Sequence, residues 1–312
     1  PARSFWWSSA RMDGLFTLLH FGLFFWILTS LYAKDELFGF IKFSALIGFG
    51  TALYGLTQWI GLPLFDSSGG GVASTTGNSA FYAMYLLFAI FFAFYAMAKE
   101  QNKNLKTLLM LAAIFEILIL LLTQNRGAIL GLVVATITFI ILKCLEPRSL
   151  NIWMGAIAGV ILLLAVFSPQ FERIRAWPTD SITAQSRIYI WEEGLKTAME
   201  HPLLGRGANN FEVAAPQTNE SFDKPHNIFV EILISYGLLG MVAYIFLIYV
   251  TIKKILTSKD NARYFILALL ASYLTALFFF FDTFSSYLMF FFMLAYIELD
   301  PLENPTCQCL EV

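Results

Sequence analysis

Arg126 is the charged residue whose position in this sequence most clearly indicates a chemical role. It lies in a turn of a few residues, 123–126, between two long apolar segments. If those segments cross a membrane, the guanidinium lies at or just within the boundary. A charge at the bilayer centre costs about 2.5–3.5 kcal/mol, and less near the surface. Guanidinium groups bind phosphate or carboxylate through two parallel hydrogen bonds. The turn therefore predicts an anion-binding arginine, with snorkelling to the surface as the alternative.

His226 is the second candidate, because it stands between a long polar segment and a long apolar one. Pro225 restricts the approach to this junction, and Asn227 can cap a helix that begins after it. A histidine facing a cavity there can act as a general base near neutral pH. We expect that role for His226, with a simple interfacial capping residue as the alternative.

The elements that must position these groups are membrane helices. Of 312 residues, 58% are hydrophobic and 13% are charged, which is too apolar for a soluble domain. The mean hydropathy is +0.68. A bilayer requires about 20 apolar residues per helix. Segments of suitable length occur at 15–32, 39–61, 80–98, 105–122, 127–143, 152–167, 227–252, 263–281 and 284–299. Because the backbone in lipid must bond internally, all should be helical.

These spans predict an all-α, polytopic transmembrane helical bundle with about nine spans and one large loop on the trans side. We expect residues 1–167 to hold the first six helices and an N-terminal outer segment. The large loop is 168–226, the last three helices fall in 227–299, and 300–312 is a cytoplasmic tail. Within the loop, residues 186–200 predict a short amphipathic helix at the membrane surface. Its expected apolar face comprises Ile188, Trp191, Leu195, Ala198 and Met199. The alternative is a helix that packs only on other loop residues.

Cationic residues divide by type between the two sides of the predicted membrane. Lysine-rich loops alternate along the chain and should be cytoplasmic. That side then holds nine Lys and two Arg, and the trans side holds seven Arg and two Lys. Topology does not distinguish lysine from arginine, so trans-side arginine favours recognition of phosphate or carboxylate. The alternative is that these arginines pair with the loop's own acids, such as Glu172, Asp180 and Glu192.

Several segments, taken in order, resemble the O-antigen ligase and O-antigen polymerase superfamily of bacterial envelope glycosyltransferases. They are residues 123–128, Arg187-x-x-x-Trp191, residues 201–211, and His226-Asn227 leading into residues 231–240. Residues 3–14 and 74–78 also resemble polymerase-like members. Arg206 departs from the aromatic or aliphatic residue expected in its motif. Family members usually have more spans, so we expect further helices before Pro1.

The resemblance implies a GT-C-like membrane glycosyltransferase that takes a glycan from a polyprenyl-diphosphate carrier. The acceptor would be a glycan, lipid or protein on the trans face of the bacterial inner membrane, and no nucleotide sugar, metal or other cofactor would be needed. Arg126 and Arg187 would bind the diphosphate, and His226 would act as the base. The substrate-binding residues implied are Arg11, Asn78, Trp191, Arg206 and Asn227.

A transporter or flippase of a lipid-linked oligosaccharide is the alternative function, because it would also need arginines on the trans side. Such proteins commonly show inverted repeats, and the sequence shows no internal repeat. The net charge of −2 gives no reason to expect nucleic acid as a partner.

Overall fold

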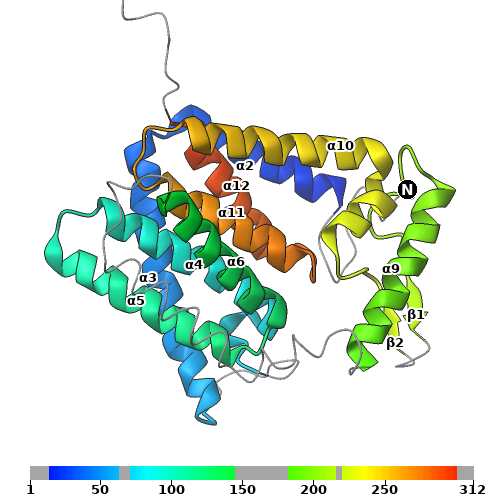
Figure 1. Ribbon diagram of the computed structural model, residues 1–312, viewed down its shortest axis with the longest axis horizontal. Coiled ribbons are helices and arrows are strands. Elements are labelled where there is room, and N and C mark those ends of the chain that lie inside the picture. Colours follow the sequence, from blue (N-terminus) through cyan, green and yellow to red (C-terminus); the bar gives the residue numbers. More distant parts are fainter. Residues whose placement is uncertain (1–13, 63–70, 145–181, 216–219, 301–312) are drawn as a thin grey trace, which may run out of the picture.

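The computed structural model describes residues 14–62, 71–144, 182–215 and 220–300, and these form a mainly helical protein (Figure 1). Nine α-helices, one 3-10 helix and one β-hairpin occur within these ranges. The helices are α2 (Leu15–Leu31), α3 (Lys34–Trp59), η1 (Ser74–Thr76), α4 (Ser79–Lys99), α5 (Lys103–Leu122), α6 (Arg126–Cys144), α9 (Ile182–Glu200), α10 (Ile228–Thr257), α11 (Arg263–Leu277) and α12 (Phe284–Glu298). The hairpin pairs β1 (Val213–Ala215) antiparallel with β2 (Glu220–Phe222).

The predicted helical class is confirmed, and each predicted span that falls within the described ranges corresponds to a helix. Five helices, α3, α4, α5, α6 and α10, are long and apolar enough to cross a membrane. Helices α2, α11 and α12 are apolar but shorter. The predicted span at 152–167 lies outside the described residues, so nine spans and a GT-C-like architecture both stay predictions.

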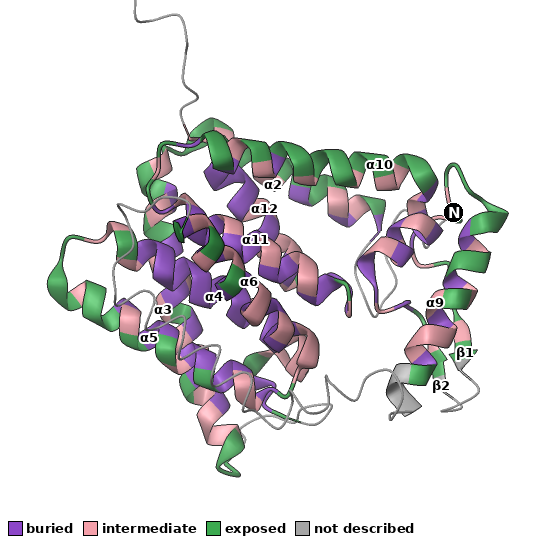
Figure 2. Cartoon of the chain, viewed as in Figure 1, coloured by how far each residue is buried: buried purple, intermediate pink, exposed green. Residues whose placement is uncertain are grey.

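Helix α4 forms the centre of the bundle (Figure 2). Its side chains Tyr82, Phe88, Phe92 and Tyr95 are fully buried, and it packs against α3, α5 and α11. Helix α10 is different, because many of its large apolar side chains are exposed on one face, including Phe246. A helix with an exposed apolar face fits a lipid environment.

Glycines bring α6 and α11 into close contact. A Cβ atom on Gly131 would lie 2.6 Å from the carbonyl oxygen of Ser272, and one on Gly127 would lie 3.2 Å from the Cβ of Phe279. Gly127 and Gly131 form a G-x-x-x-G pair, a spacing that lets two helix backbones approach closely. The second pair, Gly155 and Gly159, lies outside the described residues.

Helix α10 is kinked at Gly237, where φ is 63°. The chain just after α9 fills the kink, since Leu238 N donates to Pro202 O at 2.8 Å and Arg206 N donates to Ile234 O at 2.7 Å. A side chain at Gly237 would collide with the backbone of Leu203. The predicted span over 227–252 is therefore helical in two pieces, and the first piece lies beside α9.

Helix α9 packs on the first piece of α10 and on β1. Ala198 of the predicted apolar face is buried, whereas Met199 is 71% exposed and Leu195 is 45% exposed. The position of this face at the membrane surface stays a prediction. The buried face includes Ile190 and Ala198 in a small cluster of apolar side chains with Val230. The periodicity of the sequence identified the apolar residues of α9, but it could not show that α9 packs on α10 and β1. The hairpin was also not predicted, because its strands have only three residues each.

The bundle has two chemically distinct ends. At one end, four lysines each form an ion pair with a carboxylate: Lys34 with Asp300, Lys42 with Glu100, Lys99 with Asp260, and Lys254 with Glu298. We name this the lysine end. The opposite end, where α5 passes into α6 and α9 lies nearby, is named the arginine end for Arg126 and Arg187.

Candidate functional site

The turn before Arg126 is held by its own side chains. Thr123 Oγ1 donates to Leu120 O at 2.6 Å, and Asn125 Oδ1 accepts from Ala128 N at 2.9 Å. Gln124 has a φ of 57°, a left-handed conformation that such a tight reversal requires. Arg126 is consequently the first residue of α6, fixed at the arginine end and half-buried. The short turn predicted from the sequence is confirmed.

Arg187 comes from α9, which is remote in sequence, yet it lies close enough to Arg126 for the two charges to repel. Burial lowers the pKa of Arg187 to about 10, and the charge of Arg126 adds to this effect. No carboxylate in the described ranges forms an ion pair with Arg187. Two guanidiniums so placed form a site that an anion would stabilise.

Trp191 connects this arginine to the histidine. It lies one helical turn after Arg187 on α9, and its Nε1 donates to Pro225 O at 2.8 Å. Its ring also makes an edge contact with Phe278, with ring centroids 5.6 Å apart. Pro225 directly precedes His226, so α9 and the histidine-bearing segment are joined at this point.

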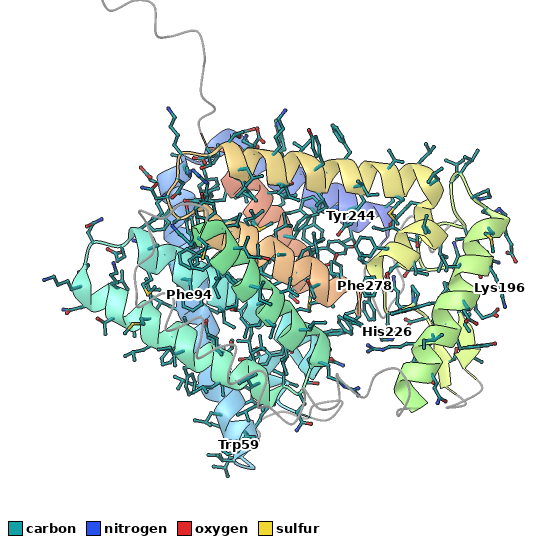
Figure 3. The ribbon with its side chains drawn as sticks, viewed as in Figure 1. Trp59, Phe94, Lys196, His226, Tyr244 and Phe278 are labelled. Atoms are coloured by element: carbon teal, nitrogen blue, oxygen red, sulfur yellow. The ribbon has the colours of Figure 1, made fainter. Side chains whose placement is uncertain are left out.

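His226 has an unusual backbone and an aromatic surround. Its φ is 52°, and a non-glycine residue in this left-handed region costs about 1–3 kcal/mol. The imidazole lies among the rings of Phe222, Phe280 and Phe281, with centroids 5.9, 5.8 and 5.1 Å away. Figure 3 shows His226 between α9 and the Phe278 end of α11. Strain held by rigid neighbours is a feature of functional sites.

The segment Phe278–Phe281 contacts Trp191, Gly127 and His226. Helix α11 ends at Leu277, whereas the sequence predicted a span to 281. Phe278 contacts Trp191, Phe279 approaches Gly127 next to Arg126, and the next two rings contact His226. Hydropathy alone assigned these phenylalanines to a span. The run of four phenylalanines directly before Asp282 is the signal that could have marked a junction.

Asp282 belongs to a buried polar group that sequence reasoning missed. Tyr273 Oη and Ser286 Oγ donate to Asp282 Oδ1 at 2.7 and 2.8 Å. Burial raises the pKa of Asp282 to about 7, although these two hydrogen bonds lower it. Nearby, buried Lys224 forms an ion pair with Glu231, and both charges influence Asp282. In the sequence, Asp282 is a single acid between two apolar segments, and Lys224 and Glu231 lie more than fifty residues before it.

The other predicted substrate-binding residues have structural partners or lie elsewhere. Asn227 Oδ1 caps α10 by accepting from Phe229 N and Val230 N, which confirms the expected cap. Asn78 Oδ1 caps α4 in the same way. Arg206 is exposed, and its guanidinium lies 3.7 Å from Glu200, as the alternative of pairing within the loop expects. Arg11 lies outside the described residues. Substrate binding by these four residues stays a prediction.

The arrangement brings the three candidate residues to one end of the bundle. Arg126 and Arg187 can bind an anion between them, and His226 can accept a proton. All three are joined through Trp191 and the Phe278–Phe281 segment.

Comparison with known proteins agrees with the motifs. Residues 109–245 match the family model described as O-antigen ligase. Two proteins named "Putative polysaccharide ligase" are also similar. The one from Rickettsia conorii is 21% identical over 165 residues, covering 48% of this chain and 40% of the relative. The one from Rickettsia bellii is 27% identical over 171 residues, covering 49% of this chain and 42% of the relative. The matches thus span less than half of either relative.

No solved structure matches the chain. The matched family region contains Arg126, Arg187 and His226. The resemblance inferred from the motifs is therefore confirmed: residues 109–245 of this membrane-type helical protein match the O-antigen ligase family.

Proposed function

We propose that the protein is a membrane glycosyltransferase of the ligase or polymerase type. It transfers a glycan from a polyprenyl-diphosphate carrier to an acceptor hydroxyl. The acceptor is a glycan, lipid or protein. The observation that carries the proposal is the pair of Arg126 and Arg187 from α6 and α9, because the charge of Arg126 reaches Arg187 and adds to the effect of its burial.

A diphosphate is the ligand whose chemistry fits this pair best. Each guanidinium can donate two parallel hydrogen bonds to phosphate oxygens. When the bond between the sugar and the phosphate breaks, negative charge grows on the departing diphosphate. Cationic donors already in place stabilise that charge without reorganising. The same groups therefore bind the donor and assist its departure.

His226 supplies the second half of the reaction. As the acceptor oxygen bonds to the anomeric carbon, its proton passes to the imidazole, and the glycan leaves the diphosphate in one displacement. The rings of Phe222, Phe280 and Phe281 limit where the imidazole can turn. Trp191 fixes the residue before the histidine. These residues orient the base and do not themselves react.

The arginine end faces the trans side of the bacterial inner membrane in this proposal, because lysines gather at the opposite end. Single cysteines at exposed Asn210 and Asn261, in a chain whose natural cysteines are replaced, test this orientation. A membrane-impermeant thiol reagent added from outside should label position 210 and leave position 261 unlabelled. Labelling of position 261 alone would reverse the topology.

The direct test uses purified protein in liposomes with a polyprenyl-diphosphate-linked glycan and an acceptor. We expect glycosylated acceptor and free polyprenyl diphosphate in equal amounts. Arg187→Gln should weaken donor binding and transfer. Lys196→Gln is the matched control on the same helix, because Lys196 is exposed and pairs with Glu193 at 2.6 Å. It should leave both unchanged.

Two results would overturn the proposal. Movement of the intact donor across the membrane with no release of polyprenyl diphosphate would favour the transporter alternative. Loss of transfer after chelation, restored by added metal, would contradict chemistry carried by arginine and histidine alone.

A further inference from the structure

Lys224 and Glu231 form an ion pair across the segment that carries His226. Lys224 Nζ donates to Glu231 Oε1, and Lys224 is only 3% exposed. His226 lies between the two residues in the sequence. The pair therefore closes residues 224–231 into a loop around the proposed base, and the reaction described above gives no part to either residue.

Stability alone does not explain a buried ion pair of this kind. Taking two charges out of water is unfavourable, and their attraction offsets that loss only when the geometry is good. Apolar side chains of similar volume often stabilise a fold equally well. A buried pair does select one conformation, because any other arrangement leaves two isolated buried charges. The pair of Lys224 and Glu231 thus indicates that one particular backbone conformation is required here.

The backbone at His226 has such a conformation. Its φ of 52° lies in the left-handed region, which is unfavourable for a residue with a side chain. The next residue, Asn227, has an extended backbone with φ of −157° and caps α10. If the segment relaxed, His226 would move to an ordinary region and its imidazole would point in another direction. The chain on both sides of His226 must therefore be held.

Both sides of His226 are anchored to helices. Glu231 lies in the first turn of α10, so its carboxylate is carried by a regular element. On the other side, Trp191 Nε1 of α9 donates to Pro225 O at 2.8 Å. Lys224, the residue before Pro225, connects the two anchors through its ion pair with Glu231.

Packing around Lys224 is not tight enough to replace the ion pair. A small cavity lies beside the pair, and its lining includes the polar residues Asn209, Asp223 and Ser235. The Lys224 side chain would have space to move if Glu231 did not hold it. The carboxylate therefore fixes the lysine, and the lysine fixes the start of the segment.

We propose that Lys224 and Glu231 are positioning residues for His226, and that their ion pair holds the left-handed backbone that directs the imidazole. Neither residue reacts, because the pair acts through the backbone of residues 225–227. The inference rests on the proposed function in taking His226 as the base.

Replacement of the whole pair by apolar side chains tests the proposal. Lys224→Met combined with Glu231→Leu leaves no isolated charge, so Tm should stay close to wild type. The kcat for transfer should fall about ten- to a hundredfold, because a small misplacement of a catalytic group has an effect of that size. KM for the donor should change little, since both arginines are intact. Wild-type kcat in the folded double variant would overturn the proposal.

Two further variants support this test. Lys254→Met with Glu298→Leu is the matched control, because it removes an ion pair with Nζ and Oε2 2.8 Å apart at the other end of α10. Its kcat should equal that of wild type. If the double variant at 224 and 231 does not fold, Glu231→Gln replaces it with the same expectation, because glutamine keeps the shape and an acceptor but loses the charge.

NMR of isotope-labelled histidine measures the position of the ring independently of transfer. In nanodiscs, the signals absent from His226→Asn identify His226. Wild type should give one sharp set of these signals, and the double variant at 224 and 231 should give shifted or multiple sets. Unchanged His226 signals in the double variant would overturn the proposal. If wild type catalyses no transfer, the proposed function fails, and the same spectra still decide whether the pair positions His226.

Discussion

At the lysine end, four lysines lie within ion-pair distance of carboxylates from other segments, whereas at the arginine end the charge of Arg126 acts on the buried guanidinium of Arg187. Paired charges join helices and need nothing more. Two like charges held close together repel each other and raise the free energy of the protein when no anion is bound. An anion bound between them offsets this repulsion. We propose that positive charge holds the fold together at one end and prepares a binding site at the other.

Substitution of His226, at the arginine end, should lower the transfer rate more than any other substitution considered at either end. His226→Asn should lower the transfer rate by about 10²–10⁴, the usual contribution of a general base. Asparagine tolerates the left-handed backbone better than most residues, so the fold should survive. Transfer rate and donor affinity are measured separately, and affinity should change little. Near wild-type transfer would assign the base to another group.

The two arginines should come next. Arg126→Lys and Arg187→Lys keep the charge but lose the forked geometry. Each should lower transfer by about ten- to a hundredfold, since one charge-assisted hydrogen bond contributes about 1.5–3 kcal/mol. Lys99→Gln at the lysine end removes a cation paired with Asp260 at 2.8 Å, and its transfer rate should stay close to wild type. Equal losses at both ends would mean that only overall charge matters.

Packing under the arginine end should have a smaller but measurable effect on stability. Gly131→Ala places a methyl group 2.6 Å from Ser272 O, so α6 must move away from α11. We expect a loss of about 1–3 kcal/mol in the free energy of unfolding and a displaced Arg126. Gly39→Ala on α3 is the control, because nothing lies within 4 Å of its new methyl group. Unchanged stability in Gly131→Ala would show that the two helices can separate freely.

Asp282 should introduce a pH dependence of stability, of at most about 1.4 kcal/mol for each pH unit. Its pKa is about 7 in the fold, against an ordinary value of 3.8. The folded state therefore holds a proton that the unfolded state has lost, and stability should fall as the pH rises through this interval. Thermal unfolding of wild type and Asp282→Asn over this range measures it. The variant should show a flatter profile, and identical slopes would assign the dependence elsewhere.

The sequence could predict the helices and name candidate residues for the site, but not how these residues meet. The helices of the bundle could be predicted from long apolar segments, because such segments form helices whichever neighbours they pack against. Asn227 and the 123–126 turn were also predictable, because capping and tight turns depend on local residue types. Arg126 and Arg187 could be named, yet their proximity depends on how α9 docks, which no local pattern shows.

The missed features have a common physical cause. Gly237 lies within an apolar run, so hydropathy gave no sign of the kink at which residues 202–207 dock. Within 185–200, the buried residues of α9 are Ser186, Ile190, Gly194 and Ala198. Ile190 is the one large apolar side chain among them, so this face is weak in an apolar pattern. Asp282 is a single acid whose burial is set by neighbouring helices. Each depends on tertiary packing, which single-sequence periodicity does not record.

The central claim is that Arg126 and Arg187 hold the diphosphate of a lipid-linked donor, and a structure with that donor bound tests it most directly. Purified protein in nanodiscs with a polyprenyl-diphosphate-linked glycan provides the sample. We predict both phosphates between the two guanidiniums, with the anomeric carbon on the side of His226. Phosphate density at the lysine end, with Arg126 and Arg187 contacting only protein, would contradict the account.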